Sequence, residues 1–94
     1  MPKIRLSGHI EVPKGRIAAI RSALPAHIAL TRAEPGCLAF DVTEDETRPG
    51  RFDVSELFAS REDFDAHQTR MTSSPWAKIT KNIPRHYNIE EVVS

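Results

Sequence analysis

Cysteine is nearly absent from the sequence. Cys37 is the only cysteine among 94 residues, so no disulfide can form within the chain. A chain without a disulfide framework is typical of a reducing compartment. The residues next to Cys37 supply neither a base nor the positive charge that activates a thiolate, so we expect a small, buried, apolar side chain rather than a nucleophile.

An excess of one charge and long apolar segments are missing too. The 13 basic and 13 acidic residues cancel, and Lys and Arg are scattered, which predicts no binding to nucleic acid or to an anionic membrane. No stretch approaches the roughly 18 apolar residues that span a bilayer. The first residues, MPKIRLSGHI, lack the apolar region of a signal peptide. We therefore predict one cytoplasmic domain, residues 1–94.

Signatures of cofactors and metals are absent as well. No GxGxxG pattern or other glycine-rich phosphate loop occurs. Four histidines, at positions 9, 27, 67 and 86, lie in different segments, and none has a second His or Cys close by in the sequence. We therefore predict no preformed zinc site and no cofactor. A cofactor-free enzyme and a protein without catalysis fit this pattern equally well.

Alternation of apolar and polar residues predicts four β-strands. Residues 3–12 alternate cleanly, and the same period of two recurs in residues 37–44, 51–59 and 83–93. The polar segment 45–50 between the second and third runs contains a proline and a glycine, so these two strands are expected to pair as a hairpin.

Two segments have the periodicity of helices. Residues 16–33 place four apolar side chains along one side, namely Ile17, Ile20, Leu24 and Ile28. Pro25 interrupts this segment and predicts a kink or two helical pieces. Ser60 is a typical N-cap for a second helix, with Asp63 three residues later. The inner side of that helix consists of Phe64, His67 and Met71, and residues 76–81 predict a further short turn.

The order strand, helix, strand, strand, helix, strand predicts a ferredoxin-like α+β plait. Two right-handed crossovers place both helices on one face of an antiparallel sheet with strand order 4-1-3-2. The other face is expected to be partly polar. A second copy of the sheet would cover it, which predicts a homodimer.

Three stretches in the same order resemble the antibiotic biosynthesis monooxygenase domain. They are LTRAEPGCLAFDV (30–42), FDVSELFASREDFDAHQTRM (52–71) and RHYNI (85–89). The positions most typical of the family are matched by Glu56, Phe58, Phe64 and His67. The resemblance covers essentially the whole chain. It implies a dimeric α+β barrel with a ligand cleft between sheet and helices in each protomer.

The family that the chain resembles contains several chemistries. Some members oxygenate quinols and polyketide anthrones without a cofactor, and others degrade haem or isomerise small metabolites. This sequence departs from two of these branches. Val54 and Phe58 stand where anthrone oxygenases carry polar and tryptophan side chains. Ser7 and Gly8 occupy the region of the haem-degrading branch's asparagine, and Trp76 follows the histidine instead of preceding it, which disfavours haem cleavage.

His67 is the predicted catalytic residue. The helical period turns it toward the sheet, where apolar surroundings favour a neutral imidazole that can accept a proton. Removing the proton of a phenol makes it electron-rich enough to reduce O₂ directly, so a positioned base supplies the main chemical help. The alternative is structural: His67 would hydrogen-bond a backbone carbonyl or Glu56 and hold helix to sheet.

Eight further side chains are candidates for contact with a flat aromatic substrate: Phe40, Phe52, Phe58, Phe64, Met71, Trp76, Arg85 and His86. The phenylalanines are equally compatible with a packed core, and Trp76 with a rim or core position. Arg85 and His86, with His9 on the neighbouring strand, would alternatively belong to the dimer surface.

The leading functional hypothesis is a cofactor-independent monooxygenase that oxidises an electron-rich aromatic, a quinol or polyketide-like phenol, with O₂. One alternative is a ligand-binding or stress-associated barrel without catalysis. Another is a cofactor-free isomerase or lyase that uses His67 to shuttle protons.

Overall fold

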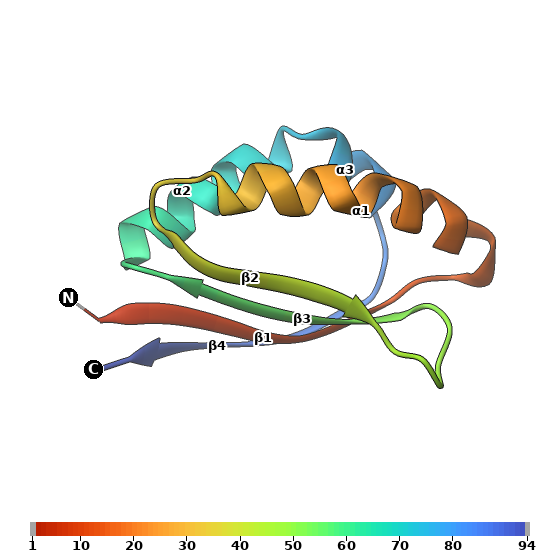
Figure 1. Cartoon of the computed structure of the whole chain (residues 1–94), viewed down its shortest axis with the longest axis horizontal. Coiled ribbons are helices and arrows are strands. Elements are labelled where there is room, and N and C mark those ends of the chain that lie inside the picture. The colour runs from red at the N-terminus through yellow and green to blue at the C-terminus, as the bar shows by residue number, and fades with distance from the viewer. Residues whose placement is uncertain (1, 94) are drawn as a thin grey trace.

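A computed structural model describes residues 2–93 as a sheet covered on one face by helices (Figure 1). The elements in chain order are β1 (Lys3–Glu11), a short 3-10 helix η1 (Lys14–Arg16), α1 (Ile17–Arg32), β2 (Cys37–Glu44), β3 (Arg51–Phe58), α2 (Arg61–Thr72), α3 (Pro75–Ile79) and β4 (Arg85–Val92). The predicted ferredoxin-like α+β architecture is therefore confirmed.

The sheet is antiparallel, with strand order β2-β3-β1-β4, as predicted. β1 is a central strand that pairs with β3 on one side and with β4 on the other, so Ile10 lies between Phe52 and Arg85. β4 is shorter than the predicted run 83–93. Ile83 instead donates its backbone N–H to the Thr80 carbonyl at 3.1 Å and closes the turn after α3.

The core lies between the sheet and the helices and consists of two clusters of buried side chains. One contains Ile10, Val12, Ile17, Ile20, Phe52 and Ile83. The other contains Ile4, Leu6, Val54, Phe58 and Phe64, with Cys37 packed against it. Cys37 is half-buried rather than fully buried, and burial raises the pKa of its thiol, which disfavours the thiolate.

The helices begin and continue for identifiable local reasons. α1 runs as one helix through Pro25, so the alternative of two helical pieces is wrong. The proline removes a single N–H donor, and the apolar side of the helix packs on the sheet along its length. Ser60 caps α2 as predicted, because its Oγ accepts a hydrogen bond from the Asp63 N–H at 3.2 Å. Pro75 starts α3 at a position where no donor is needed.

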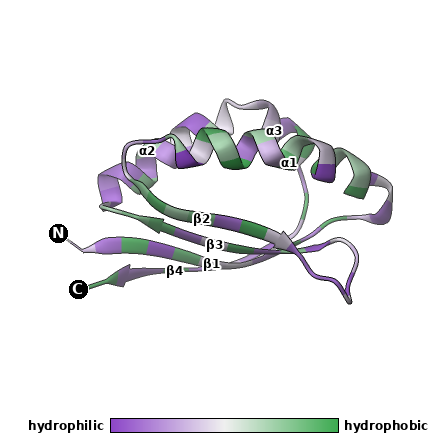
Figure 2. Cartoon of the chain, viewed as in Figure 1, coloured by the Kyte–Doolittle hydropathy of each residue, from purple (hydrophilic) through white to green (hydrophobic). Residues whose placement is uncertain are grey.

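The face of the sheet that the helices leave uncovered is largely polar, as expected. Figure 2 shows hydrophilic and hydrophobic residues alternating along β1. The apolar parity points to the helices, and the other parity carries Arg5, Ser7, His9 and Glu11. Within residues 2–93, no helix has the length and hydrophobicity needed to cross a membrane.

Candidate functional site

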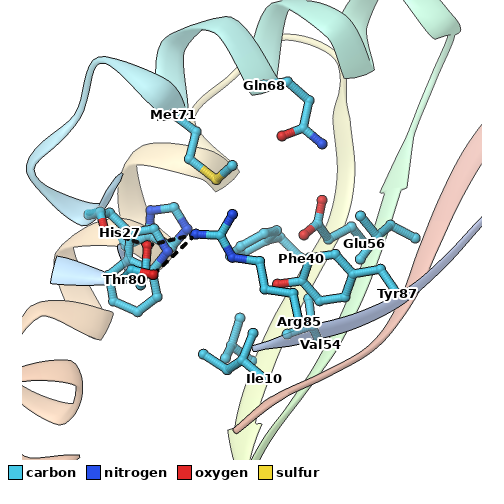
Figure 3. Close-up of a pocket in the computed structure, with 13 residues that line it drawn as sticks. Ile10, His27, Phe40, Val54, Glu56, Gln68, Met71, Thr80, Arg85 and Tyr87 are labelled. Atoms are coloured by element: carbon cyan, nitrogen blue, oxygen red, sulfur yellow. Dashed lines mark hydrogen bonds between the residues drawn. The ribbon is translucent and has the colours of Figure 1, made fainter. Parts of the chain in front are cut away.

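A small cavity lies between the sheet and the helices. Its volume is about 40 Å³, and all four strands and all three α-helices contribute to its walls. Figure 3 shows Gln68 and Met71 reaching down from α2, while Glu56 and Arg85 point inward from β3 and β4. The site therefore combines apolar walls with a few polar groups, which is the usual composition of a small-molecule pocket.

Glu56 is a strongly perturbed group in this cavity. It occupies the middle of β3 with its side chain on the helix face, and the residue is 7% exposed. Burial, and secondarily the nearby Glu34, raise the pKa of Glu56 to about 7. Its Oε1 atom is buried and accepts no hydrogen bond from the described residues. A carboxyl group with this pKa can take up or release a proton near neutral pH.

His67, the catalytic residue predicted from the sequence, lies behind Glu56 and does not line the cavity. The residue is 1% exposed, and its ring packs against Phe58 at 4.9 Å between centroids. Nδ1 lies 2.8 Å from Glu34 Oε2, and Nε2 lies 3.8 Å from Glu56 Oε1. A carboxylate only accepts hydrogen bonds, so the contact with Glu34 places the proton on Nδ1. The ring therefore has the apolar neighbours expected from the sequence and, in addition, two flanking carboxyl groups.

A line of charged groups leads from the cavity to the outside. Behind Glu56 and His67, the Oε1 atom of Glu34 lies 3.3 Å from Nε of Arg70. Arg70 also donates from Nη2 to Thr31 Oγ1 at 3.1 Å. In the sequence, Glu34 precedes Pro35 and Gly36, a combination that predicts the end of the first helix. The sequence carries no signal for its contact with His67, because the two residues are 33 positions apart.

His27 is a second titratable wall residue, and the sequence interpretation missed it. Its ring stacks on Trp76 at 4.4 Å with an interplanar angle of 7° and meets Phe40 edge-on at 5.4 Å. Burial first, then the positive charges near it, lower the pKa of His27 to about 4, so the ring is neutral at neutral pH. The signal was available: His27 is seven residues after Ile20 and three after Leu24, on the same side of α1.

Arg85 brings positive charge to the cavity. Its guanidinium donates from Nη2 to Thr80 Oγ1 at 3.0 Å, and Figure 3 shows the side chain crossing the pocket toward Thr80 and His27. Thr80 is buried at 2% exposure and is fixed in turn by donating to the Trp76 carbonyl at 2.8 Å. Arg85 can therefore face an anionic group in the cavity, while its hydrogen bond to Thr80 restricts the mobility of its side chain.

The predicted substrate contacts divide into three groups. Those that line the cavity are Phe40, Met71, Trp76 and Arg85. Those that are packed in the core, outside the cavity, are Phe52, Phe58 and Phe64. His86 lies on the opposite face of the sheet, because alternation along β4 separates it from its neighbour Arg85.

One known protein family matches most of the chain. The family model described as antibiotic biosynthesis monooxygenase matches residues 4–76. The chain belongs to the antibiotic biosynthesis monooxygenase family. The match contains Glu56, His67, His27 and Trp76, while β4 with Arg85 lies beyond it.

Solved structures with the family's fold resemble the chain over nearly its whole length. A Nitrosomonas europaea protein provisionally named as an antibiotic biosynthesis monooxygenase has 22% identity and a TM-score of 0.79, with 96% of each chain covered. A Deinococcus radiodurans protein, provisionally named likewise, has 21% identity and a TM-score of 0.77, with 97% of this chain and 93% of that chain covered.

A Bacteroides thetaiotaomicron protein of unknown function has 23% identity and a TM-score of 0.76, with 96% of this chain and 97% of that chain covered. Sequence identities this low establish the fold but do not establish a particular reaction. No curated protein matches the chain. The chemistry of this family member therefore has to be argued from its own cavity.

Proposed function

We propose that the chain is a cofactor-independent monooxygenase that oxidises an electron-rich aromatic, a quinol or polyketide-like phenol, with O₂. The observation that carries the proposal is Glu56, a buried carboxyl group with a pKa near 7 and a free Oε1 in a pocket that also holds Arg85. Membership in the antibiotic biosynthesis monooxygenase family supports the reaction class.

Glu56 takes the role of the base. In its ionised form it removes the proton of a substrate hydroxyl, and its pKa matches that task at neutral pH. Arg85 faces the resulting phenolate and stabilises its negative charge. The phenolate is electron-rich enough to pass one electron to O₂, and recombination of the two radicals forms a carbon–oxygen bond.

The overall reaction balances without an external reductant. The CH₂ group of an anthrone, or its enol tautomer, gives up four electrons and becomes a carbonyl group. A quinol likewise gives up four electrons, because one ring C–H becomes C–OH and the two hydroxyl groups become the carbonyl groups of a hydroxyquinone. One atom of O₂ enters the product, and the other leaves as water with the two hydrogens. The residues of the pocket therefore need only to bind, orient and deprotonate the substrate.

His67 becomes a positioning residue in this proposal instead of the base predicted from the sequence. It lies behind Glu56, with Nδ1 held by Glu34 and Nε2 3.8 Å from Glu56 Oε1. The fixed imidazole restricts the rotation of the Glu56 carboxyl group. After a small movement of one of the two side chains, Nε2 can also accept the proton that Glu56 has taken up. Phe40 and the stacked pair His27–Trp76 provide flat walls for the aromatic ring.

Substrate binding requires the cavity to open. A volume of about 40 Å³ holds only a few water molecules, well below the several hundred Å³ of typical ligand sites. Arg85 is the long side chain that crosses the space, and its contact with Thr80 is exchangeable for one with the substrate oxygen. We expect Arg85 to move from Thr80 to the substrate on binding.

A homodimer fits the exposed apolar side chains of β4. Tyr87 and Ile89 are 41% and 47% exposed, and they share the helix-side parity of Arg85 at the open edge of the cavity. A second copy that covers this edge would bury both side chains and close the pocket. Light scattering coupled to size exclusion tests the dimer, and replacement of Tyr87 and Ile89 by Ser should yield monomers.

An isomerase is the second candidate, and one specific observation favours it. The cavity presents two groups able to exchange protons, the Glu56 carboxyl and the neutral His27 imidazole. A pair of this kind can take a proton from one carbon and return one at another without O₂. Turnover under strictly anaerobic conditions would identify this reaction.

The test of the oxygenase uses purified protein treated with chelator and a panel of hydroquinones and anthrones. We expect O₂ uptake above the blank and, with ¹⁸O₂, one labelled oxygen in the product and one in water. Glu56→Gln should abolish uptake, and Glu90→Gln on β4 is the matched control with the same charge change at an exposed site. Uptake that is equal in Glu56→Gln and wild type, or absent with every substrate, contradicts the proposal.

A further inference from the structure

Three potential metal ligands meet on the uncovered face of the sheet, on the side opposite the cavity. His9 and Glu11 are two residues apart on β1 and point to the same face. His86 on β4 is the direct register partner of His9. The group therefore consists of two imidazoles and one carboxylate, contributed by the central strand β1 and the edge strand β4.

The backbone fixes this pairing at close range. Gly8, next to His9, has a φ of 149°, and a Cβ at this position would collide with the His86 backbone carbonyl. Glycine therefore allows β4 to approach β1 closely beside the two histidines. The imidazole rings stack with centroids 4.7 Å apart and an interplanar angle of 22°. Rings held by paired strands lose little further freedom when they bind an ion.

The spacing of the ligand atoms suits one ion. His86 Nε2 lies 3.3 Å from Glu11 Oε2, and His9 Nε2 lies 3.6 Å from Glu11 Oε1. One ligand atom from each residue can be chosen such that all three lie within 4.8 Å of one another. Bonds of about 2.0–2.1 Å to a tetrahedral zinc ion separate neighbouring ligands by roughly 3.3 Å. To bind one ion, the two stacked imidazole rings must turn so that their in-plane nitrogen lone pairs converge on it.

The cations on this face leave Glu11 available. Arg51 is the register partner of Glu11 on β3, but its Nε donates to Asp53 Oδ1 at 3.1 Å. The groups within contact distance of the Glu11 carboxylate are the two histidines. In the single chain the side chains of Glu11 and His86 are more than half exposed, which leaves room beside them for an ion and its remaining water ligands.

We propose that His9, Glu11 and His86 form a binding site for a divalent transition metal ion, with Zn²⁺ as the ion of first choice. Two nitrogen ligands and one oxygen ligand select Zn²⁺, Cu²⁺ or Ni²⁺ over Mg²⁺ and Ca²⁺, which prefer oxygen alone. Three protein ligands leave at least one position for water or an added ligand. The site is separate from the cavity and independent of the oxygenase proposal.

Sequence spacing did not reveal this cluster, because its two histidines are far apart in the chain and meet only through strand pairing. A second copy packed on the same face would bring a second, identical cluster. All three ligands come from one chain, so the expected stoichiometry is one ion per chain in either oligomeric state.

The experiment measures Zn²⁺ binding to tag-free protein by equilibrium dialysis with elemental analysis, and Cu²⁺ binding by electron paramagnetic resonance. We expect one ion per chain, nitrogen hyperfine structure from two imidazoles, and an affinity that falls as the pH drops, because protons compete with the metal ion for the ligand atoms. His86→Ala and Glu11→Gln should each weaken Zn²⁺ binding by at least about tenfold. Glu90→Gln, on the same strand and face as His86, should bind as wild type does.

Two results would overturn the proposal. One is unchanged Zn²⁺ affinity in the His9→Ala, His86→Ala double variant with the fold intact by circular dichroism. The other is a Cu²⁺ spectrum without nitrogen ligands. Oxygen uptake with substrate serves as the independent control, since loss of metal binding should leave it unaltered.

Discussion

Glu56 and Glu11 project from opposite faces of one sheet and differ in what surrounds them. Glu56, in the cavity, is 7% exposed, and burial raises its pKa to about 7. Glu11, on the uncovered face, has a side chain that is 59% exposed, and hydrogen bonding with His86 lowers its pKa. The same residue type is thus prepared for proton transfer on one face and kept as an anion on the other. Burial decides between the two roles.

The largest expected effect concerns the rate of O₂ uptake as a function of pH. If the ionised Glu56 is the base, kcat/KM should rise by about tenfold per pH unit below about pH 7 and then level off, a total of roughly two to three orders of magnitude. A stopped-flow or electrode assay measures this profile. Glu11→Gln should leave it unchanged, and a profile without an inflection near neutrality would remove Glu56 from the mechanism.

The next effect is on stability. The pKa of folded Glu56 is about 7, against an ordinary value of 4.5, so the folded chain binds this proton more tightly than the unfolded chain. The stability that protonated Glu56 contributes is fully present below about pH 4.5 and is lost as the pH rises through 7. Relative to Glu56→Gln, wild type should lose on the order of 3 kcal/mol of unfolding free energy over this range.

Urea denaturation of wild type and Glu56→Gln at several pH values measures that difference. Glu90→Gln again serves as the control, because it makes the same substitution at an exposed site. A flat difference for Glu56→Gln would mean that water reaches the buried carboxyl group in solution.

An effect of similar size and opposite sign is expected for His27, because its pKa shift is as large as that of Glu56. Its folded pKa of about 4 is below the ordinary 6.5, so the folded chain binds this proton less tightly. The stability that depends on neutral His27 should be fully present above about pH 6.5 and should be lost as the pH drops through 4. His27→Phe keeps a flat ring against Trp76 and removes the titration, so the variant should avoid a loss on the order of 3 kcal/mol of unfolding free energy at low pH. His86→Asn, at the exposed imidazole, is the control in the same urea titrations.

The smallest effect is expected on the uncovered face. Glu11→Gln removes a carboxylate whose contacts lie in solvent, where ion pairs contribute little. The urea midpoint without added metal should stay within experimental error of wild type. A clear loss of stability would show that the two faces differ less than their exposure suggests, and that the face is covered in solution.

The sequence was sufficient for the topology because each element carries a local signal. Alternation along residues 3–12, the cap at Ser60 and the proline-glycine turn before β3 all point to one order of elements. Topology in turn predicted the strand order, since two right-handed crossovers leave few alternatives.

The site was harder to predict, since it depends on contacts between residues distant in sequence. The helical period correctly turned His67 inward, but the neighbouring position of Glu34 depends on how a loop after α1 folds over α2. His27 lay on a recognisable helix side and was overlooked because Ile28 is the more hydrophobic neighbour. The pairing of His9 with His86 follows from strand register, which the sequence predicts only once β1 and β4 are placed side by side.

The stacking of His27 on Trp76 also gives the molecule an optical probe. Trp76 is the only tryptophan of the chain, so all indole emission arises at the wall of the cavity. Protonated imidazole quenches indole fluorescence on contact, so emission should dim as His27 takes up its proton in acid. A ligand that binds between the strands and Trp76 should alter the same fluorescence signal, so ligand-binding titrations need no added dye.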